Sequence, residues 1–474
     1  MGRRPLKDED LCFTPAAELA PMIRRKELSP VELMRAVLAR VEACEPKLNA
    51  MARFIPEAAM AGAKAAETAL MKDRPIGPLH GIPVTIKDLH YVKGVTNERG
   101  SVTQKGFVPD TDAPFVSRLK DAGAIVIGKT TVCEFAWKGV SQSPLTGITS
   151  NPWKLGYNTG ASSAGAGAAS AAGYGPLHQG SDGAGSVRMP AHFSGIFGLK
   201  PTFGRIPNWP VGSNDNTSHL GPMTRDVRDS AMMMSVISGP HPWDFTSLEA
   251  CPADYVGRLD EGIRGRKIAY SPDLGHARVD PEVADLVAAA VKVLATDCGA
   301  SVEQVTPAWG KDGPEIIRVM YPVHATGNAK YLAEYESRMD PALVAMIRDG
   351  LKVTTQQYQA IRDRKSAYVT AMARFMEDWD FLVTPTVSVA AFPAELIAPK
   401  HWPQHPWDWI QWAEFSYPFN FSGMPAATVP CGFTREGLPV GLQIVGRRFD
   451  DLGVMQASQA FAKARPWMAK RPSF

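Results

Sequence analysis

Residues 79–88 read LHGIPVTIKD, and the tetrad Pro-Val-Thr-Ile inside this stretch predicts a short buried strand. Three of its four residues are β-branched, and such side chains favour the pleated backbone of a strand. Farther along the chain, residues 115–122 predict a helix and residues 124–127 predict a second strand. Because strand and helix alternate here, the sequence predicts an α/β fold, with Lys87 at the carboxyl end of the first strand.

The overall composition narrows the classes of protein. The chain has 474 residues, of which 45% are hydrophobic, and it can therefore bury a large core. Its 51 basic and 48 acidic side chains leave a net charge of +3, far from the concentrated positive surface that nucleic acids select. We therefore expect no nucleic acid as a partner.

The cysteines and the apolar runs indicate where the protein works. Six cysteines stand singly with no CxxC pair, which is typical of a reducing compartment rather than of a disulfide framework. The first residues, MGRRPLKDEDLCF, contain no apolar signal region, and no run of 18 apolar residues follows. We expect a cytoplasmic protein that does not associate with membranes.

Residues 158–185 consist almost entirely of Gly, Ala and Ser, and two interpretations of them compete. Gly- and Ser-rich stretches are often flexible linkers. Alanine, however, outnumbers the other residues between 164 and 172, which favours a closely packed helix.

Later segments predict further helices and one more strand. Pro281 can begin a helix that Gly299 ends, and residues 354–379 predict another helix. Residues 440–445 predict a final strand, and a helix follows from Asp450.

Two short motifs suggest nucleotide binding but lack its structural context. Residues 123–130, GAIVIGKT, match the Walker A pattern letter for letter. The four variable positions are Ala, Ile, Val and Ile, which favour a strand over a loop that turns its amides toward a phosphate. Gly165 and Gly167 resemble the start of a dinucleotide fingerprint, but Ser170 stands at the third glycine position and no hydrophobic strand precedes them.

Other familiar hydrolase motifs are missing from the sequence. The ten histidines form no HExxH or other close ligand spacing, so no metal site is expected. No GxSxG elbow offers the nucleophile of a Ser-His-Asp triad. If the chain is a hydrolase, we expect a base other than histidine and no metal or organic cofactor.

Lys87, Ser162 and Ser186 are the chemically plausible set that remains. Ser186 follows three small residues, 183–185, whose amides can approach a bound carbonyl and stabilise an oxyanion. Lys87 can act as a base only where burial keeps part of its amine neutral. Ser162 can relay a proton because a hydroxyl both donates and accepts a hydrogen bond.

Each of these residues also has a plain structural interpretation. A serine in a Gly-rich turn is usually only a turn residue, and a lysine at a strand end is usually solvated. Asp182 and Arg188 can be a structural ion pair and nothing more. Only the joint arrangement favours a catalytic site.

That joint arrangement resembles the amidase signature family, the serine hydrolases with a Ser-Ser-Lys triad. The resemblance runs from about Thr14 to Phe461, and Ser162 and Ser186 stand 24 residues apart, as the two triad serines of the family do. The motifs that carry it are GPLHGIPVTIKD, DAGAIVIGKTTVCEFA, the Ser162-Ser163 segment, GSDGAGSVRMPAHFSGIFGLKPTFGRI, DFLVTPTV and YPFNFSGMPAATVPCGFTREGLPVGLQIVGRRFDD. It also explains the Walker A match, because the family commonly has a strand ending in Gly-Lys-Thr there.

The resemblance implies a role for each site residue. Ser186 would be the nucleophile, Ser162 the bridging serine and Lys87 the terminal base. The oxyanion hole would consist of Gly183, Ala184, Gly185 and the amide of Ser186, and the supporting residues would be Ser163, Asp182 and Arg188.

This sequence departs from the usual family pattern at four places. Alanine replaces the common glycine at positions 161, 164 and 184, and Ser181 stands where threonine is common. The family would also place a cis peptide bond between Ala161 and Ser162. Because alanine tolerates a positive φ poorly, we expect Ala184 to reshape the oxyanion loop slightly.

The same resemblance implies one α/β domain over residues 1–474, with a mixed twisted β-sheet flanked by helices on both faces. The expected regions are an N-terminal helical part at 1–75, the signature core at 76–205, a less regular part bordering the substrate at 206–420, and a final strand and helix at 421–474.

The implied reaction is hydrolysis of the C–N acyl bond of a small amide, anilide or carbamate (urethane) through an acyl-enzyme on Ser186; esters are also substrates in the family. The aromatic stretch at 387–419 can line an apolar substrate pocket, or it can be core or a dimer contact. Its candidate substrate-binding residues are Trp402, Trp407, Trp409 and Trp412.

Two other classes of function remain open. The chain also resembles the amidase component of a glutamyl-tRNA amidotransferase, which would work inside a complex. A noncatalytic binding module is the third class, although the presence of Lys87, Ser162 and Ser186 together speaks against it. For the hydrolase we expect only a small-molecule partner and a monomer or homodimer.

Overall fold

The computed structural model describes residues 7–212, 214, 216–249 and 253–474. The expectation about the N-terminal segment and the expectation about the six cysteines fall partly outside these residues, at positions 1–6 and at Cys251 respectively. Across the described ranges, no helix is both long and apolar enough to cross a bilayer.

A mixed sheet of eleven strands runs through the described chain. In spatial order the strands are β1 (Met51–Phe54), β3 (Ile125–Thr130), β2 (Pro83–Lys87), β8 (Leu177–Asp182), β10 (His219–Thr224), β9 (Phe197–Lys200), β14 (Ala426–Phe433), β15 (Pro439–Gly446), β13 (Phe381–Pro385), β11 (Lys267–Tyr270) and β12 (Ser301–Gln304). β2 is parallel to β3 and β8, β11 is parallel to β12 and β13, and the other neighbours are antiparallel. The expected α/β class with a mixed sheet is confirmed.

Two small hairpins lie outside this sheet. They pair β4 (Gln142–Ser143) with β5 (Gly147–Ile148), and β6 (Ser150–Asn151) with β7 (Lys154–Asn158).

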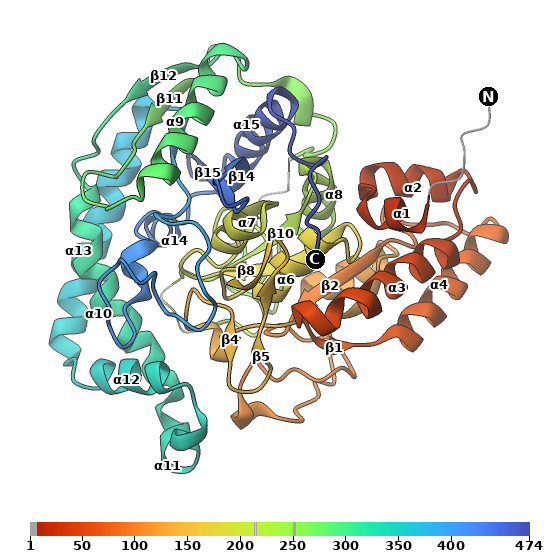
Figure 1. Cartoon of the computed structure of the whole chain (residues 1–474), viewed down its shortest axis with the longest axis horizontal. Coiled ribbons are helices and arrows are strands. Elements are labelled where there is room, and N and C mark those ends of the chain that lie inside the picture. The colour runs from red at the N-terminus through yellow and green to blue at the C-terminus, as the bar shows by residue number, and fades with distance from the viewer. Residues whose placement is uncertain (1–6, 213, 215, 250–252) are drawn as a thin grey trace.

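Helices surround the sheet, and those that are adjacent in sequence gather in groups (Figure 1). The helices are α1 (Asp8–Phe13), α2 (Ala16–Arg24), α3 (Pro30–Leu48), α4 (Pro56–Met71), α5 (Pro114–Asp121), α6 (Ala164–Ala172), α7 (Arg188–Ser194), α8 (Val227–Ile237), α9 (Pro281–Thr296), α10 (Gly313–Ala325), α11 (Leu332–Tyr335), α12 (Pro341–Gly350), α13 (Thr355–Phe375), α14 (Pro418–Phe421) and α15 (Asp451–Ala464). In Figure 1, α1–α4 lie at the β1 end of the molecule and α10, α12 and α13 at the opposite end.

The central strands bury both of their faces. Ala427 and Val429 of β14 belong to the hydrophobic cluster that includes α15, whereas Ala426 of β14 and Val445 of β15 belong to a second cluster that includes α7. Side chains alternate between the two faces of a strand, so these neighbouring positions point in opposite directions. Helices therefore cover both faces of the sheet, as expected.

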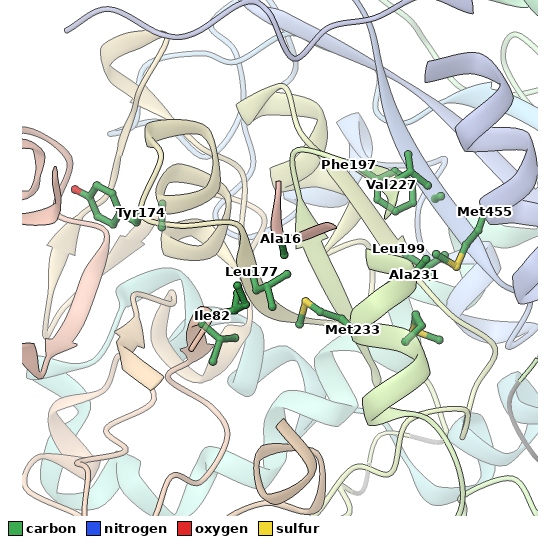
Figure 2. Close-up of a cluster of buried hydrophobic side chains, with 14 of the residues drawn as sticks. Ala16, Ile82, Tyr174, Leu177, Phe197, Leu199, Val227, Ala231, Met233 and Met455 are labelled. Atoms are coloured by element: carbon green, nitrogen blue, oxygen red, sulfur yellow. The ribbon is translucent and has the colours of Figure 1, made fainter. Parts of the chain in front are cut away.

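Figure 2 shows part of the first cluster. Leu199 of β9, Ala231 of α8 and Met455 of α15 come from distant parts of the sequence and contribute to the same buried core. Leu177 belongs to the same core and lies in β8, the strand that ends at Asp182. Burying one large apolar side chain stabilises the fold by about 1.5–3 kcal/mol, so clusters of this size hold the sheet and helices together.

The Gly- and Ala-rich segment contains a buried helix, which excludes the linker interpretation. All nine residues of α6 are buried. A Cβ on Gly165 would lie 2.2 Å from the carbonyl oxygen of Ala50 and 2.4 Å from the backbone nitrogen of Thr131. Only a helix of very small residues can approach the sheet so closely, and this approach brings the serines before α6 to the ends of the strands.

Most of the expected elements are confirmed to within a few residues. The strands around 83–86 and 440–445 are β2 and β15, and the helices predicted from 281 and over 354–379 are α9 and α13. The region at 206–420, which was expected to be less regular, holds α8–α13 and β10–β13 together with long irregular stretches such as residues 386–408. Its strands have only four to six residues, too few to show a clear alternation between many turns.

We expect Gly165→Ala to destabilise the protein strongly, because the new methyl group would meet backbone atoms that cannot move aside. Gly62→Ala in α4 is the matched control, since its Cβ would meet only the flexible side chain of Ile125, at 3.1 Å. That control should be neutral or gain about 0.5–1 kcal/mol from helix propensity. Thermal unfolding followed by circular dichroism compares the two; equal melting temperatures would show that α6 is not held closely against β3.

Candidate active site

Lys87 lies at the centre of the candidate site, at the carboxyl end of β2 between β3 and β8. The side chain is wholly buried. Its Nζ lies 2.7 Å from Ser162 Oγ, 3.0 Å from Ser181 Oγ and 3.2 Å from the carbonyl oxygen of Ser181. The structure therefore brings the expected base and the expected bridging serine into direct hydrogen-bonding contact.

Burial makes the Lys87 amine a usable base at neutral pH. Loss of hydration lowers the pKa of Lys87 from 10.5 to about 7, and the negative charge of Asp182 offsets only part of this effect. A neutral amine has two N–H donors and one lone pair. If both N–H groups donate to the two oxygens of Ser181, the lone pair remains for the hydroxyl of Ser162.

Ser162 and Ser163 lie just before α6 and connect two parts of the site. The peptide bond between Ala161 and Ser162 is cis, as the family resemblance implied. Ser163 Oγ donates to the carbonyl oxygen of Ser181 at 3.1 Å and accepts from the Ser181 backbone N–H at 3.2 Å. The backbone N–H of Ser163 donates to the carbonyl oxygen of Ser186 at 3.3 Å. Ser163 thus holds the bridging serine next to the end of β8 and to Ser186.

Asp182 ends β8 and organises the turn that carries Ser186. Its carboxylate accepts hydrogen bonds from Nε and Nη2 of Arg188, both at 2.9 Å, and from the backbone N–H groups of Gly185 at 2.7 Å and Val187 at 3.1 Å. Burial alone would raise the pKa of this carboxyl, but the Arg188 guanidinium outweighs burial and holds it well below the usual range. An ionised Asp182 therefore shapes the whole turn.

This turn leaves three backbone amides for a developing oxyanion. The N–H groups of Gly183, Ala184 and Ser186 have no hydrogen-bond acceptor among the residues that the structure describes. The expected oxyanion hole differs at Gly185, whose N–H is occupied by Asp182. Position 185 needs a glycine, because its φ is +116° and a Cβ there would lie 2.6 Å from Cβ of Ser416.

Alanine at position 184 does not strain the turn. Ala184 is not among the residues with a positive φ, so its side chain costs nothing in backbone conformation. The expected reshaping of the loop by this alanine is therefore not observed.

Ser186 lies near the other two triad candidates, because its carbonyl oxygen accepts from the N–H of Ser163, the residue after Ser162. Ser186 retains 6% exposure, whereas Lys87 is inaccessible. In the part of the chain that is described, no hydrogen bond links Ser186 Oγ to Ser162 Oγ. Hydrogen bonds of a catalytic site are often long in the empty enzyme and shorten when the substrate binds. The geometry thus places the nucleophile candidate beside the pair formed by Lys87 and Ser162.

Three supporting residues were missed by the sequence analysis. Asn420 Nδ2 donates to Asp182 Oδ1 at 2.8 Å, and its Oδ1 accepts from Arg188 Nη2. Gln443 Oε1 accepts from Arg188 Nη1 at 2.7 Å, and Ser416 Oγ donates to the Ala184 carbonyl oxygen at 2.6 Å. A polar residue inside an aromatic or β-branched run was the available signal, but the sequence cannot show that these residues lie beside Asp182.

The four tryptophans expected at a substrate pocket lie in the hydrophobic core instead. Trp402, Trp407, Trp409 and Trp412 are all at most 6% exposed and belong to one buried cluster. Their indole N–H groups donate to the carboxylates of Asp280 and Asp349 and to the carbonyl oxygens of Trp137 and Ile397. Of the two interpretations of this segment, the structure favours core packing.

The Walker A resemblance has a structural explanation as well. Its last six residues, 125–130, form strand β3, and Lys129 is buried within it. Lys129 Nζ lies 3.1 Å from Asp88 Oδ1 and 2.8 Å from Asn97 Oδ1. This lysine is therefore committed to an internal ion pair, as the strand-like composition predicted.

Comparisons with known proteins agree with this geometry. A family model described as Amidase matches residues 32–455. The chain is 36% identical to an acylamidase of Rhodococcus erythropolis, over 99% of each chain. It is also 33% identical to a glutamyl-tRNA(Gln) amidotransferase component of Chloroflexus aggregans, over 94% of this chain and 95% of that one.

Solved structures are similar over almost the full length. A bacterial aryl acylamidase described as an amidase signature enzyme superposes with a TM-score of 0.90 at 28% identity, covering 97% of this chain and 99% of that one. A 6-aminohexanoate cyclic dimer hydrolase complexed with substrate superposes with a TM-score of 0.88 at 30% identity and the same coverage.

The pKa of Lys87 sets a pH dependence for the reactivity of Ser186. Only the neutral amine can accept a proton, so the rate of labelling by a fluorophosphonate should rise with pH, pass its midpoint near pH 7 and level off about one pH unit above. Labelling reactions that are quenched at a series of times and analysed by intact-protein mass spectrometry measure this rate. A rate that is flat between pH 5.5 and 8.5 would exclude Lys87 as the base.

Ser162→Ala and Ser163→Ala are a matched pair of neighbouring substitutions. Ser162→Ala removes the hydroxyl that contacts Lys87 Nζ, and we expect it to slow fluorophosphonate labelling at least 100-fold. Ser163→Ala removes two supporting hydrogen bonds to the Ser181 backbone and no contact with Lys87, and it should slow labelling far less. The assignment of Ser162 is refuted if the two variants label at equal rates.

Proposed function

Because this chain belongs to the amidase family, we propose that it hydrolyses the C–N acyl bond of a small amide, anilide or carbamate through an acyl-enzyme on Ser186. Membership in the family makes it a hydrolase of carbon–nitrogen bonds other than peptide bonds. The single observation that carries the mechanism is the 2.7 Å contact between a wholly buried Lys87 and Ser162, next to the turn of Ser186.

In the first half of the proposed reaction, Ser186 Oγ attacks the substrate carbonyl carbon. Its proton passes to Ser162, whose own proton passes to the lone pair of Lys87. The negative charge that develops on the carbonyl oxygen is stabilised by the free amides of Gly183, Ala184 and Ser186. One such donor typically contributes a factor of about 100 to 1,000 in rate.

In the second half, the C–N bond breaks and the amine leaves. The Lys87 ammonium returns a proton through Ser162 to the leaving nitrogen, which an amine needs because its anion is a poor leaving group. Water then attacks the acyl group on Ser186 while the same relay takes up a proton from that water. The bond between the acyl group and Ser186 Oγ breaks, the relay returns the proton to Oγ, and the carboxylic acid leaves.

A cavity of about 330 Å³ is the space that we assign to the substrate. One side of it is formed by Trp137, which closely follows Cys133. Cys133 in turn packs against Ala161, the residue before the bridging serine. These neighbours support our proposal that this side of the cavity faces Lys87 and Ser162.

A second segment of the cavity lining is close in sequence to a residue that approaches the oxyanion turn. Asn214 lines the cavity, and Ser218, four residues farther on, approaches that turn. Ser218 Oγ lies 3.7 Å from the position that a Cβ on Gly183 would take. A substrate in this cavity would thus lie between the relay and the oxyanion donors.

Aromatic side chains in the cavity favour an aryl or alkyl substrate over a very small one. Phe135, Trp137, Tyr321 and Tyr331 all contribute to its lining. A similar bacterial structure is named an aryl acylamidase, which supports an anilide as the first substrate to test. Carbamates (urethanes) and esters present the same carbonyl to Ser186 and belong to the proposed range.

The second candidate is the amidase component of a glutamyl-tRNA amidotransferase, favoured by the 33% identity to that protein. We propose instead that the chain works without partner proteins, as a monomer or homodimer acting on a small molecule. The proposal also retains a reducing, cytoplasmic setting, which rests on the single spacing of the cysteines.

Ser186→Ala should reduce the turnover of anilides at least 1,000-fold while leaving the melting temperature within a few degrees of wild type. Ser194→Ala is the control, since Ser194 is a buried serine in α7 whose hydroxyl has no hydrogen-bond partner among the described side chains. Release of 4-nitroaniline from 4-nitroacetanilide measures both variants. Wild-type turnover by Ser186→Ala would overturn the proposed mechanism.

The purified chain alone should hydrolyse members of a panel of anilides, aliphatic amides, carbamates and esters, followed by chromatography of the products. A component of an amidotransferase would instead need its partners, so activity on the panel without added protein argues for the first candidate. Release of ammonia from glutamine only after the partner proteins are added would favour the second.

A further inference from the structure

The cavity assigned to the substrate has a charged side as well as an aromatic one. Arg99 and Lys330 both line it, and its lining contains no aspartate or glutamate. Neither cation forms an ion pair with any residue in the described part of the chain. Among the residues that the structure describes, the cavity therefore offers two exposed positive charges without an ion-pair partner.

Arg99 is held close to the catalytic lysine by its own backbone. Its N–H donates to Asp88 Oδ2 at 3.0 Å, and Asp88 is the neighbour of Lys87. Its carbonyl oxygen accepts from the Phe135 N–H at 2.9 Å. The position of Arg99 is thus coupled both to the end of β2 and to the aromatic wall of the cavity.

Lys330 comes from a segment far from Arg99 in the sequence. It belongs to the 3-10 turn Thr326–Tyr331 that follows α10. The next residue, Tyr331, stacks on Phe135 with ring centroids 5.5 Å apart and an interplanar angle of 7°, and its hydroxyl oxygen accepts from Gln104 Nε2 at 2.9 Å. The backbone of Arg99 is thus hydrogen-bonded to Phe135, and Lys330 Nζ lies 5.1 Å from the centroid of the Tyr331 ring that stacks on Phe135.

Glu98, the neighbour of Arg99, and Glu134, the neighbour of Phe135, do not pair with these cations. Glu98 accepts a hydrogen bond from the Gly106 backbone N–H at 2.8 Å. Glu134 is buried and accepts from Ser101 Oγ and from the Asp340 backbone N–H, both at 2.7 Å. Both carboxylates have partners elsewhere and neither lines the cavity.

We propose that this cavity selects substrates that carry a carboxylate beyond the scissile bond, and that Arg99 and Lys330 bind that carboxylate while the aromatic wall holds the connecting part. This inference rests on the proposed function and narrows its substrate class. Arginine matches the two oxygens of a carboxylate with paired donors, and lysine adds a movable point charge. The preferred substrate is then an amide, anilide or carbamate of a dicarboxylic acid or of an amino acid, with one acid group left free.

The test compares anilides with and without a free carboxylate, and glutaryl- and pentanoyl-4-nitroanilide are the pair of equal chain length. Pentanoyl-4-nitroanilide is the neutral reference, and succinyl-, glutaryl- and adipoyl-4-nitroanilide carry the carboxylate on the acyl side. Butyryl-3-carboxy-4-nitroanilide carries it on the amine side. For wild type, we expect kcat/KM of the best carboxylate substrate to exceed that of the neutral reference about tenfold at low salt and less at 0.5 M NaCl.

The double variant Arg99→Glu/Lys330→Glu should remove or reverse this ratio, at least tenfold against wild type. The matched control is Lys64→Glu/Lys72→Glu, which makes the same change in net charge at exposed lysines at or next to α4 that do not line the cavity. The control should keep the wild-type ratio. The inference is overturned if wild type shows no preference for either carboxylate position, or if the double variant keeps the preference.

A binding measurement separates this inference from the proposed function. Calorimetric titration of Ser186→Ala with glutaryl- and pentanoyl-4-nitroanilide reports affinity without turnover. Hydrolysis of the neutral anilide with no carboxylate preference refutes only the inference. Preferential binding of the carboxylate compounds, with no hydrolysis of any panel member by wild type, refutes the proposed function and keeps the binding site.

Discussion

The buried ion pair between Asp182 and Arg188 is the constraint on which the site depends. Both side chains are fully inaccessible, and the carboxylate gathers the amides of the turn before Ser186 around itself. Arg188 extends the pair to Asn420 and Gln443, more than 200 residues away in sequence. Removing one partner of such a pair typically costs about 3–5 kcal/mol, because it leaves a buried charge unpaired. The shape of the turn therefore depends on how β8 and the C-terminal segments that carry Asn420 and Gln443 pack together.

The same site holds two ionisable groups in opposite states. Asp182 stays charged because Arg188 compensates its burial, whereas Lys87 loses much of its charge because no carboxylate pairs with it. Burial also lowers the pKa of Lys129 in the adjacent strand, but there Asp88, 3.1 Å away, offsets part of this effect directly. Because the surroundings of each group set its charge state, one fold can supply both a structural anion and a neutral base near pH 7.

The topology explains why these groups meet. β2 and β8 are parallel neighbours, so their carboxyl ends, at Lys87 and Asp182, reach the same edge of the sheet. Open α/β sheets commonly bind ligands at that edge. The close approach of α6, made possible by Gly165, then brings Ser162 to Lys87.

The sequence by itself determined the α/β class, the strand that ends at Lys87 and, through its motifs, the three triad candidates, since these depend on local propensity and on the identity and spacing of residues. It could not decide whether Trp409 and its neighbours face a ligand or the core, because burial depends on what packs against them. Only the tertiary structure decided that the Gly185 amide belongs to Asp182, that Asn420 supports the turn, and that Arg99 and Lys330 share a cavity. Such contacts join residues that are far apart in the chain, and a linear pattern contains no record of which distant segments fold against each other.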